Sequence, residues 1–240
     1  MVDDALQHIT VQFLKRKSHA TQKVIEYMAY LKARGKSPCS IRVNCRSEFV
    51  NETLMKYSST QGIVLQMTAL YSPSQNGVAK RMNCTLVELA CTILAASKLP
   101  EFLWELAIEH IAYVRNFVFT HAQLDMTPYQ AWHGIKPDVS HLCEFGTPVW
   151  ILQQGPNICH KMLPKSERRA YVSYNNGSKA IKYYNAAMRN IPTSRNFKFL
   201  NRDTLPPPDE IEIDPPSQGE SSLSEGEREG ADTWSEQSIS

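Results

Sequence analysis

The chain has 240 residues, of which 42% are hydrophobic, which is enough for one good-sized core plus an appendage. No apolar run approaches the roughly 18 residues of a membrane span, and the six cysteines form no CxxC or zinc spacing, so we expect reduced thiols in an intracellular protein with no membrane partner. The net charge of +2 hides a strong asymmetry, because residues 203–240 hold 11 acidic residues and one basic residue, leaving 25 basic and 13 acidic residues elsewhere. A body this basic favours a polyanionic partner, and a merely basic surface is the alternative.

The first part of the chain alternates between strand and helix patterns. Alternating or β-rich runs predict short strands over residues 9–17, 39–45 and 62–68. Helical spacing predicts a helix over 19–35 that ends on Gly35, and a short helix over 51–60 that begins at an Asn cap. This order of elements is typical of α/β architecture.

Two longer helices and a β-rich region follow. The apolar spacing predicts a helix from Gly77 to Ser97, and a second long helix follows Pro100. From about residue 135 short β-type runs alternate with turns, and "NNG" at 175–177 indicates a hairpin. The Pro/Ser/Glu-rich segment after Leu205 is too polar to offset its ordering entropy, so we expect disorder there.

Three stretches in order resemble the integrase region of copia-type LTR-retrotransposon polyproteins. They begin "SEFVNETLMKYSST", "TPYQAWHGIKPDVSHLCEFG" and "RRAYVSYNNGSKAIKYYN", and the resemblance covers about residues 3–202. It implies an RNase H-like integrase core over 1–134, an SH3-like β-barrel over 135–202 and a disordered acidic tail over 203–240. The segment "VDDALQHITVQFLKRKS" resembles the part of the family that follows its first strand, so the resemblance implies a core without that strand and without its Asp.

The resemblance also implies where the family's chemistry would lie. Such integrases join a DNA 3′-hydroxyl to a target phosphodiester, and three carboxylates hold two Mg²⁺ or Mn²⁺ ions at the reacting oxygens. In "IRVNCRSEF" (41–49), Asn44 stands at the position of the second Asp, and Glu48 is a retained neighbour. In "QNGVAKRMN" (75–83), Lys80 stands at the position of the Glu. The 35 residues between them match the family's spacing.

These replacements predict that the metal site is lost. An amide oxygen is neutral where Mg²⁺ prefers anionic ligands. The ammonium of Lys80 would repel the ion, since two like unit charges about 4 Å apart repel by roughly 4 kcal/mol at an effective dielectric near 20. We therefore expect no catalytic residues, no metal and no cofactor in a chain that derives from a metal-dependent enzyme.

Nucleic-acid binding is the function that these replacements leave in place. In the family, the helix after the Gln-Asn-Gly turn packs against DNA, so the candidate contacts are the polar residues of this helix and those flanking the old site: Arg42, Arg46, Lys80, Arg81 and Asn83. The expected partner is DNA, bound weakly and without sequence preference, and a homo-oligomer is a further expectation. Three alternatives stay open: solvated side chains at a helix start, a relic that folds poorly, and a non-catalytic binding or protein-interaction module retained by a host.

The β-rich region contains a second mixture of basic and aromatic residues. Basic residues from Lys161 to Lys198 alternate with Tyr183, Tyr184, Phe197 and Phe199. Such a mixture suits a surface that follows a nucleic-acid backbone with stacking side chains. For the aromatic residues we favour the other interpretation, in which they form the core of a small barrel.

Overall fold

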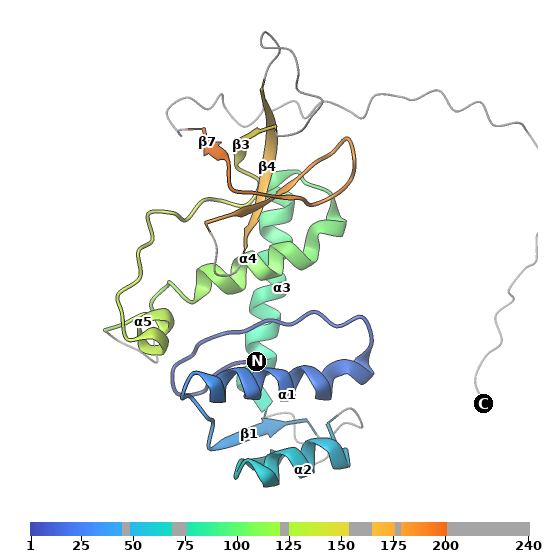
Figure 1. Cartoon of the computed structure of the whole chain (residues 1–240), viewed down its shortest axis with the longest axis vertical. Coiled ribbons are helices and arrows are strands. Elements are labelled where there is room, and N and C mark those ends of the chain that lie inside the picture. Colours follow the sequence, from blue (N-terminus) through green and yellow to red (C-terminus); the bar gives the residue numbers. More distant parts are fainter. Residues whose placement is uncertain (45–48, 69–75, 121–124, 154–164, 176–178, 201–240) are drawn as a thin grey trace, which may run out of the picture.

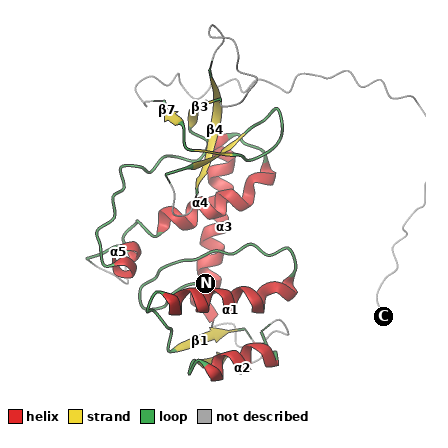
Figure 2. Cartoon of the chain, viewed as in Figure 1, coloured by secondary structure: helices red, strands yellow, loops and turns green. Residues whose placement is uncertain are grey.

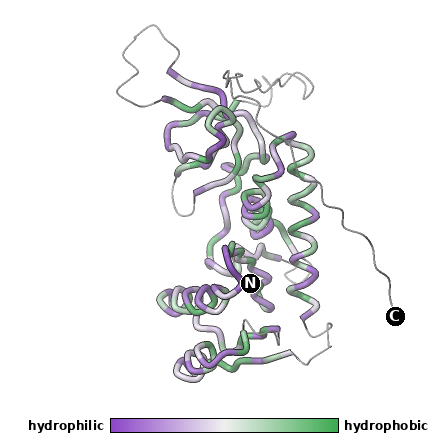
Figure 3. Tube along the Cα trace, turned by 90° about the vertical axis from the view of Figure 1, so that its right-hand side faces the viewer, coloured by the Kyte–Doolittle hydropathy of each residue, from purple (hydrophilic) through white to green (hydrophobic). Residues whose placement is uncertain are grey.

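The computed structural model describes residues 1–44, 49–68, 76–120, 125–153, 165–175 and 179–200, and it combines helices with two β-sheets (Figure 1). A layer near the N-terminus lies at one end, a five-stranded sheet lies at the other, and the long helix α3 (Gly77–Ser97) runs between them. The side view in Figure 3 shows the same helix along the length of the molecule. The α/β class is therefore confirmed.

The N-terminal layer contains α1 (Ala20–Ala33), β1 (Ser40–Val43), α2 (Glu52–Thr60) and β2 (Val64–Met67), and the 3₁₀ turn η1 (Lys17–His19) precedes α1. Strands β1 and β2 pair in parallel. The expected cap of α2 is confirmed, because the Asn51 side chain accepts a hydrogen bond from the Leu54 N–H at 2.9 Å. The layer has its own hydrophobic cluster, centred on Met28, Leu54 and Ile63.

The strand predicted over residues 9–17 is wrong. Only Ile9 makes a β-bridge there, to Val2, and residues 10–14 lie in irregular backbone. The backbone N–H and carbonyl of Ile9 instead bond to the side-chain amide of Asn116 at 2.8 and 3.0 Å. An alternating pattern forms a strand only where a neighbouring edge can satisfy its backbone groups, and here a side chain takes that role.

Helices α3 and α4 (Trp104–Arg115) form the middle of the molecule, with the 3₁₀ turn η3 (Glu101–Leu103) between them and the short helix α5 (Pro128–His133) beyond. Leu86 of α3 packs with Ile9 and Ala112. Further along α3, Ala90 and Leu94 join a larger cluster that includes residues of α4 and of the sheet. The two long helices predicted from apolar spacing are confirmed. Among the described residues no helix is long and apolar enough to cross a membrane.

The C-terminal sheet is antiparallel with the strand order β6-β5-β4-β3-β7. Figure 2 shows three of its strands, β3, β4 and β7, in yellow. Its strands are β3 (Pro148–Leu152), β4 (Ser166–Tyr174), β5 (Ile181–Tyr184), β6 (Thr193–Ser194) and β7 (Phe197–Phe199). Val149, Ile151, Tyr171 and Ile181 form the buried cluster of the sheet.

The expected pairing of the strands on either side of "NNG" is present in β4 and β5, while residues 176–178 lie outside the described residues. The SH3-like barrel stays a prediction, and the tail at 203–240 also lies outside the described residues.

Candidate functional site

Asn44 lies where three segments meet. It directly follows β1, and its side-chain oxygen accepts a hydrogen bond from Nδ2 of Asn76 at 3.3 Å and another from Oγ1 of Thr68 at 3.5 Å. Thr68 directly follows β2, and its backbone N–H donates to the Val43 carbonyl at 3.1 Å. Asn76 immediately precedes α3. The structure therefore brings the start of the helix that carries Lys80 against the end of β1.

Lys80 lies on the face of α3 that continues from Asn76, because residues four apart lie one turn above each other on a helix. Helical side chains lean toward the amino end of their helix, and Asn76 lies at that end of α3. The side chain is exposed and makes no hydrogen bond or ion pair with any residue that the structure describes.

The electrostatics at this end of α3 favour anions. The amino terminus of a helix carries a partial positive charge and usually attracts acidic side chains. The first turn of α3 contains no acidic residue, and Lys80 and Arg81 add two full positive charges to it. Asn83 is exposed one turn further along. This arrangement can attract a phosphate, and it disfavours a divalent cation.

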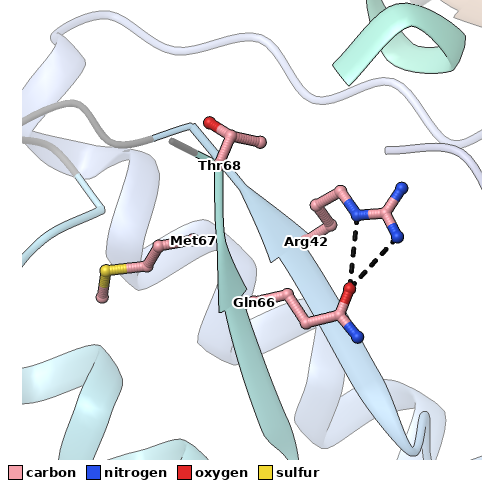
Figure 4. Close-up of a pocket in the computed structure, with 4 residues that line it drawn as sticks. All are labelled: Arg42, Gln66, Met67 and Thr68. Carbon is pink, nitrogen blue, oxygen red and sulfur yellow. Dashed lines mark hydrogen bonds between the residues drawn. The ribbon is translucent and has the colours of Figure 1, made fainter. Parts of the chain in front are cut away.

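Arg42 lines a pocket of about 340 Å³ beside Asn44, together with Gln66, Met67 and Thr68 (Figure 4). Arg42 and Gln66 face each other across the parallel strands, and both Nε and Nη2 of Arg42 donate to Oε1 of Gln66 at 3.2 Å. Gln66 therefore orients the guanidinium of Arg42 at the end of the paired strands.

Two of the predicted site residues, Arg46 and Glu48, lie outside the described residues, so their positions do not enter the geometry. In the part of the chain that the structure describes, no three His, Cys, Asp or Glu side chains are grouped as metal ligands. Around Asn44 the described groups are its own amide oxygen, which already accepts two hydrogen bonds, the hydroxyl of Thr68 and the amide of Asn76. These groups do not fit Mg²⁺, which requires several anionic oxygens.

The sequence reasoning missed Trp150 on the outer face of the C-terminal sheet. Its side chain is 40% exposed and lines a second pocket of about 550 Å³. The signal that could have found it is the alternation in "PVWIL", where Val149 and Ile151 are buried and Trp150 and Leu152 are exposed. All five residues are apolar, so the run does not reveal from composition which face is turned to solvent. The aromatic residues Tyr183, Tyr184, Phe197 and Phe199, by contrast, pack in or against the hydrophobic clusters, while the barrel expected around them stays a prediction.

Comparison with known proteins finds similarity to retrotransposon Pol polyproteins. A Pol polyprotein from the tobacco transposon TNT 1-94 is 25% identical over 202 residues, which cover 82% of this chain and 15% of the polyprotein. The Gag-Pol polyprotein of the yeast transposon Ty1-DR6 is 34% identical over 118 residues, which cover 49% of this chain and 7% of the polyprotein. The chain is therefore similar in sequence to retrotransposon Pol polyproteins of the Ty1 and TNT 1-94 kind. It spans only a small part of their length, and no family model matches it.

Two solved structures show a weak likeness to this Pol relative. A simian T-cell lymphotropic virus intasome in complex with the PP2A regulatory subunit B56 gamma has a TM-score of 0.45 at 16% identity, covering 82% of this chain and 70% of that one. The HTLV-2 integrase catalytic core domain in complex with magnesium has a TM-score of 0.41 at 18% identity, covering 55% of this chain and 81% of that one. Both TM-scores lie below 0.5, so neither structure supports a conclusion about this chain.

Proposed function

We propose that this chain is a retrotransposon integrase-core fragment, with an RNase H-like core and an SH3-like module, that binds nucleic acid without catalysing strand transfer. The observation that supports it is the environment of Asn44. Asn44 has an amide where the family has a carboxylate. Its side-chain oxygen already accepts a hydrogen bond from Asn76, which immediately precedes α3, the helix that carries Lys80.

The charge at position 80 decides whether the site favours a catalytic metal ion or a phosphate. Replacing a glutamate by Lys80 changes the local charge by two units, from attraction toward a cation to repulsion. With roughly 4 kcal/mol between unit charges about 4 Å apart at an effective dielectric near 20, the repulsion of a divalent ion is about twice as large. The same ammonium attracts the negative charge of a phosphate. The site therefore favours the DNA backbone over the metal that would cleave or join it.

A metal titration and a reaction assay together test the loss of catalysis. We expect no Mg²⁺- or Mn²⁺-dependent cleavage or joining of duplex DNA, and no saturable Mn²⁺ binding by electron paramagnetic resonance. The double variant Asn44→Asp/Lys80→Glu restores the acidic charge at both positions, so it should bind Mn²⁺ more strongly than the unmodified chain does. Metal-dependent activity in the unmodified chain would show that the proposal is wrong.

A salt titration tests the binding. Replacing Lys80 and Arg81 together by Gln should weaken duplex binding and reduce the slope of log K against log [salt] by about 2, since each phosphate contact contributes about 0.9. Lys56→Gln is the matched control, because Lys56 is an exposed lysine on a different helix, where it pairs with Glu52 at 3.3 Å. If the unmodified chain shows no salt-dependent DNA binding, the host-retained protein-interaction module becomes the better reading.

A further inference from the structure

The outer face of the C-terminal sheet presents an aromatic side chain that packing does not explain. Trp150 lies in the middle of β3, the strand between β4 and β7, where its neighbours Val149 and Ile151 are 0% and 5% exposed. Tryptophan is highly buried on average in folded proteins, so a Trp that is 40% exposed in the middle of a strand paired on both sides is a candidate for a contact outside the chain.

Two cations flank this tryptophan. Trp150 is directly opposite Arg168 on β4 and directly opposite Lys198 on β7. Residues opposite each other on neighbouring strands point to the same face, with Cβ atoms about 5 Å apart. Both cations are exposed, and neither forms an ion pair with a residue that the structure describes. The nearest acid along β4, Glu167, pairs instead with Arg169.

The pocket beside the indole has polar groups at its edge. Its lining consists of Trp150, Leu152, Ser166, Asn196, Phe197 and Lys198. The backbone carbonyl of Asn196 accepts the N–H of Leu152 at 3.0 Å, which holds this residue beside β3. Its side-chain amide makes no hydrogen bond with the described residues, so the amide can meet the edge of a planar ligand whose face lies on the indole.

We propose that Trp150, Arg168 and Lys198, the Trp150 face, form a site for single-stranded nucleic acid, separate from the α3 site. The indole stacks on an unpaired base, and the two cations contact the phosphates on either side of that base. A duplex keeps its bases stacked inside and offers the indole no exposed base face. A proline-rich peptide would suit the apolar part of the pocket, but it gives no reason for cations on both sides of the ring.

The test measures three ligands with the full-length chain by fluorescence anisotropy. The ligands are a labelled oligo(dT), an abasic sugar-phosphate strand of the same length, and a duplex. Trp150→Ala should weaken oligo(dT) binding roughly 5- to 150-fold, the range measured for loss of one base-stacking side chain, and should leave abasic binding within about twofold of the unmodified chain. Trp150→Phe should restore most of the lost affinity.

The two cations, Arg168 and Lys198, are tested separately through the salt dependence of binding. Arg168→Gln/Lys198→Gln should reduce the salt slope by about 1.4, because a single strand contributes about 0.7 per phosphate contact. This variant decides the question if Trp150→Ala fails to fold. The matched control is Trp104→Ala, since Trp104 is 49% exposed but lies beside Glu105 at the acidic start of α4. It should leave oligo(dT) binding unchanged.

The proposal is overturned if Trp150→Ala binds oligo(dT) like the unmodified chain, if it loses oligo(dT) and abasic binding equally, or if proline-rich peptides compete and nucleic acids do not. Its failure is distinct from failure of the α3 site. Changes at Lys80 and Arg81 act on phosphates and should weaken duplex and abasic binding alike, whereas Trp150 should matter only where a base is exposed.

Discussion

Asn116 offers a sharp test of how the N-terminal segment is held. Its side chain is 8% exposed, and it bonds both backbone polar groups of Ile9, accepting from the N–H at 2.8 Å and donating to the carbonyl at 3.0 Å. Ile9 itself is 4% exposed and packs against Leu86 and Ala112. The substitution Asn116→Ala removes both partners at once and leaves the two backbone groups buried.

The expected loss of stability follows from the backbone N–H and carbonyl of Ile9, which would be left without hydrogen-bond partners. A buried donor or acceptor without a partner costs about 1–3 kcal/mol, so the free energy of unfolding should fall by about 2–5 kcal/mol. For a chain of this size each kcal/mol corresponds to roughly 2–4 °C, so a loss of about 3 kcal/mol should lower Tm by about 6–12 °C.

Urea unfolding followed by circular dichroism measures this loss directly. The denaturant slope should stay constant, which would show that the native state has lost stability without changing its extent of burial. Asn83→Ala is the matched control, because Asn83 is exposed on α3 and its replacement should change stability by less than about 0.5 kcal/mol. A fall below about 1 kcal/mol for Asn116→Ala would show that water reaches Ile9 and that the reasoning is wrong.

Four further outcomes are expected. Burial holds the pKa of His110 at about 4, below its usual 6.5. The unfolded chain therefore binds the extra proton first, and this group should lower stability by about 3 kcal/mol as pH drops from about 6.5 toward 4. His110→Gln should make the fall less steep without abolishing it, because burial also lowers the pKa of His8 to about 4. Gly146→Ala should cost at least about 2 kcal/mol in urea unfolding, because Gly146 has φ +83° and an added Cβ would lie 2.6 Å from Ser97 Cβ. A double-mutant cycle on Lys182 and Glu109, whose charged atoms are 2.8 Å apart and half-buried, should give a coupling of about 1 kcal/mol. Deleting residues 203–240, which carry 11 of the 24 acidic residues, should raise DNA affinity several-fold at low salt and less at high salt.

Controls for these outcomes lie elsewhere in the chain. Gly134→Ala, at φ +75° with nothing within 4 Å of the added Cβ, should cost only about 1 kcal/mol, and an equal cost at both glycines would contradict the steric argument. The exposed pair Lys56–Glu52 should couple by only about 0.3 kcal/mol. A stability profile that stays flat from pH 7 to 4 would show that His110 is hydrated.

Local signals in the sequence predicted most helices of this structure. The Asn51 cap and the apolar spacing of α3 act within a few residues, so they can be read without knowing the fold. The strand expected around Ile9 failed because strand formation depends on a partner edge, and residue 116 lies far away in the sequence. Trp150 was missed for a similar reason, since only the pairing of three strands shows that it stands between two cations.

The candidate site was predictable in position but not in detail. The resemblance assigned Asn44 and Lys80 to two positions of one site, and the structure brings the end of β1 against the start of α3. The hydrogen bonds from Thr68 and Asn76 that occupy the amide of Asn44 depend on how β2 and α3 approach it. No pattern along the chain encodes that approach.

The hydrophobic cluster of the N-terminal layer has a consequence for how the molecule opens. Its members all fall between Val24 and Leu65, whereas the clusters that include α3 draw on Ile9, α4 and the C-terminal sheet. A unit whose apolar contacts are local in sequence can lose and regain them on its own. Native-state hydrogen exchange should therefore divide the amides into two classes, with those of α1 and α2 exchanging at a lower opening free energy than those in the middle of α3.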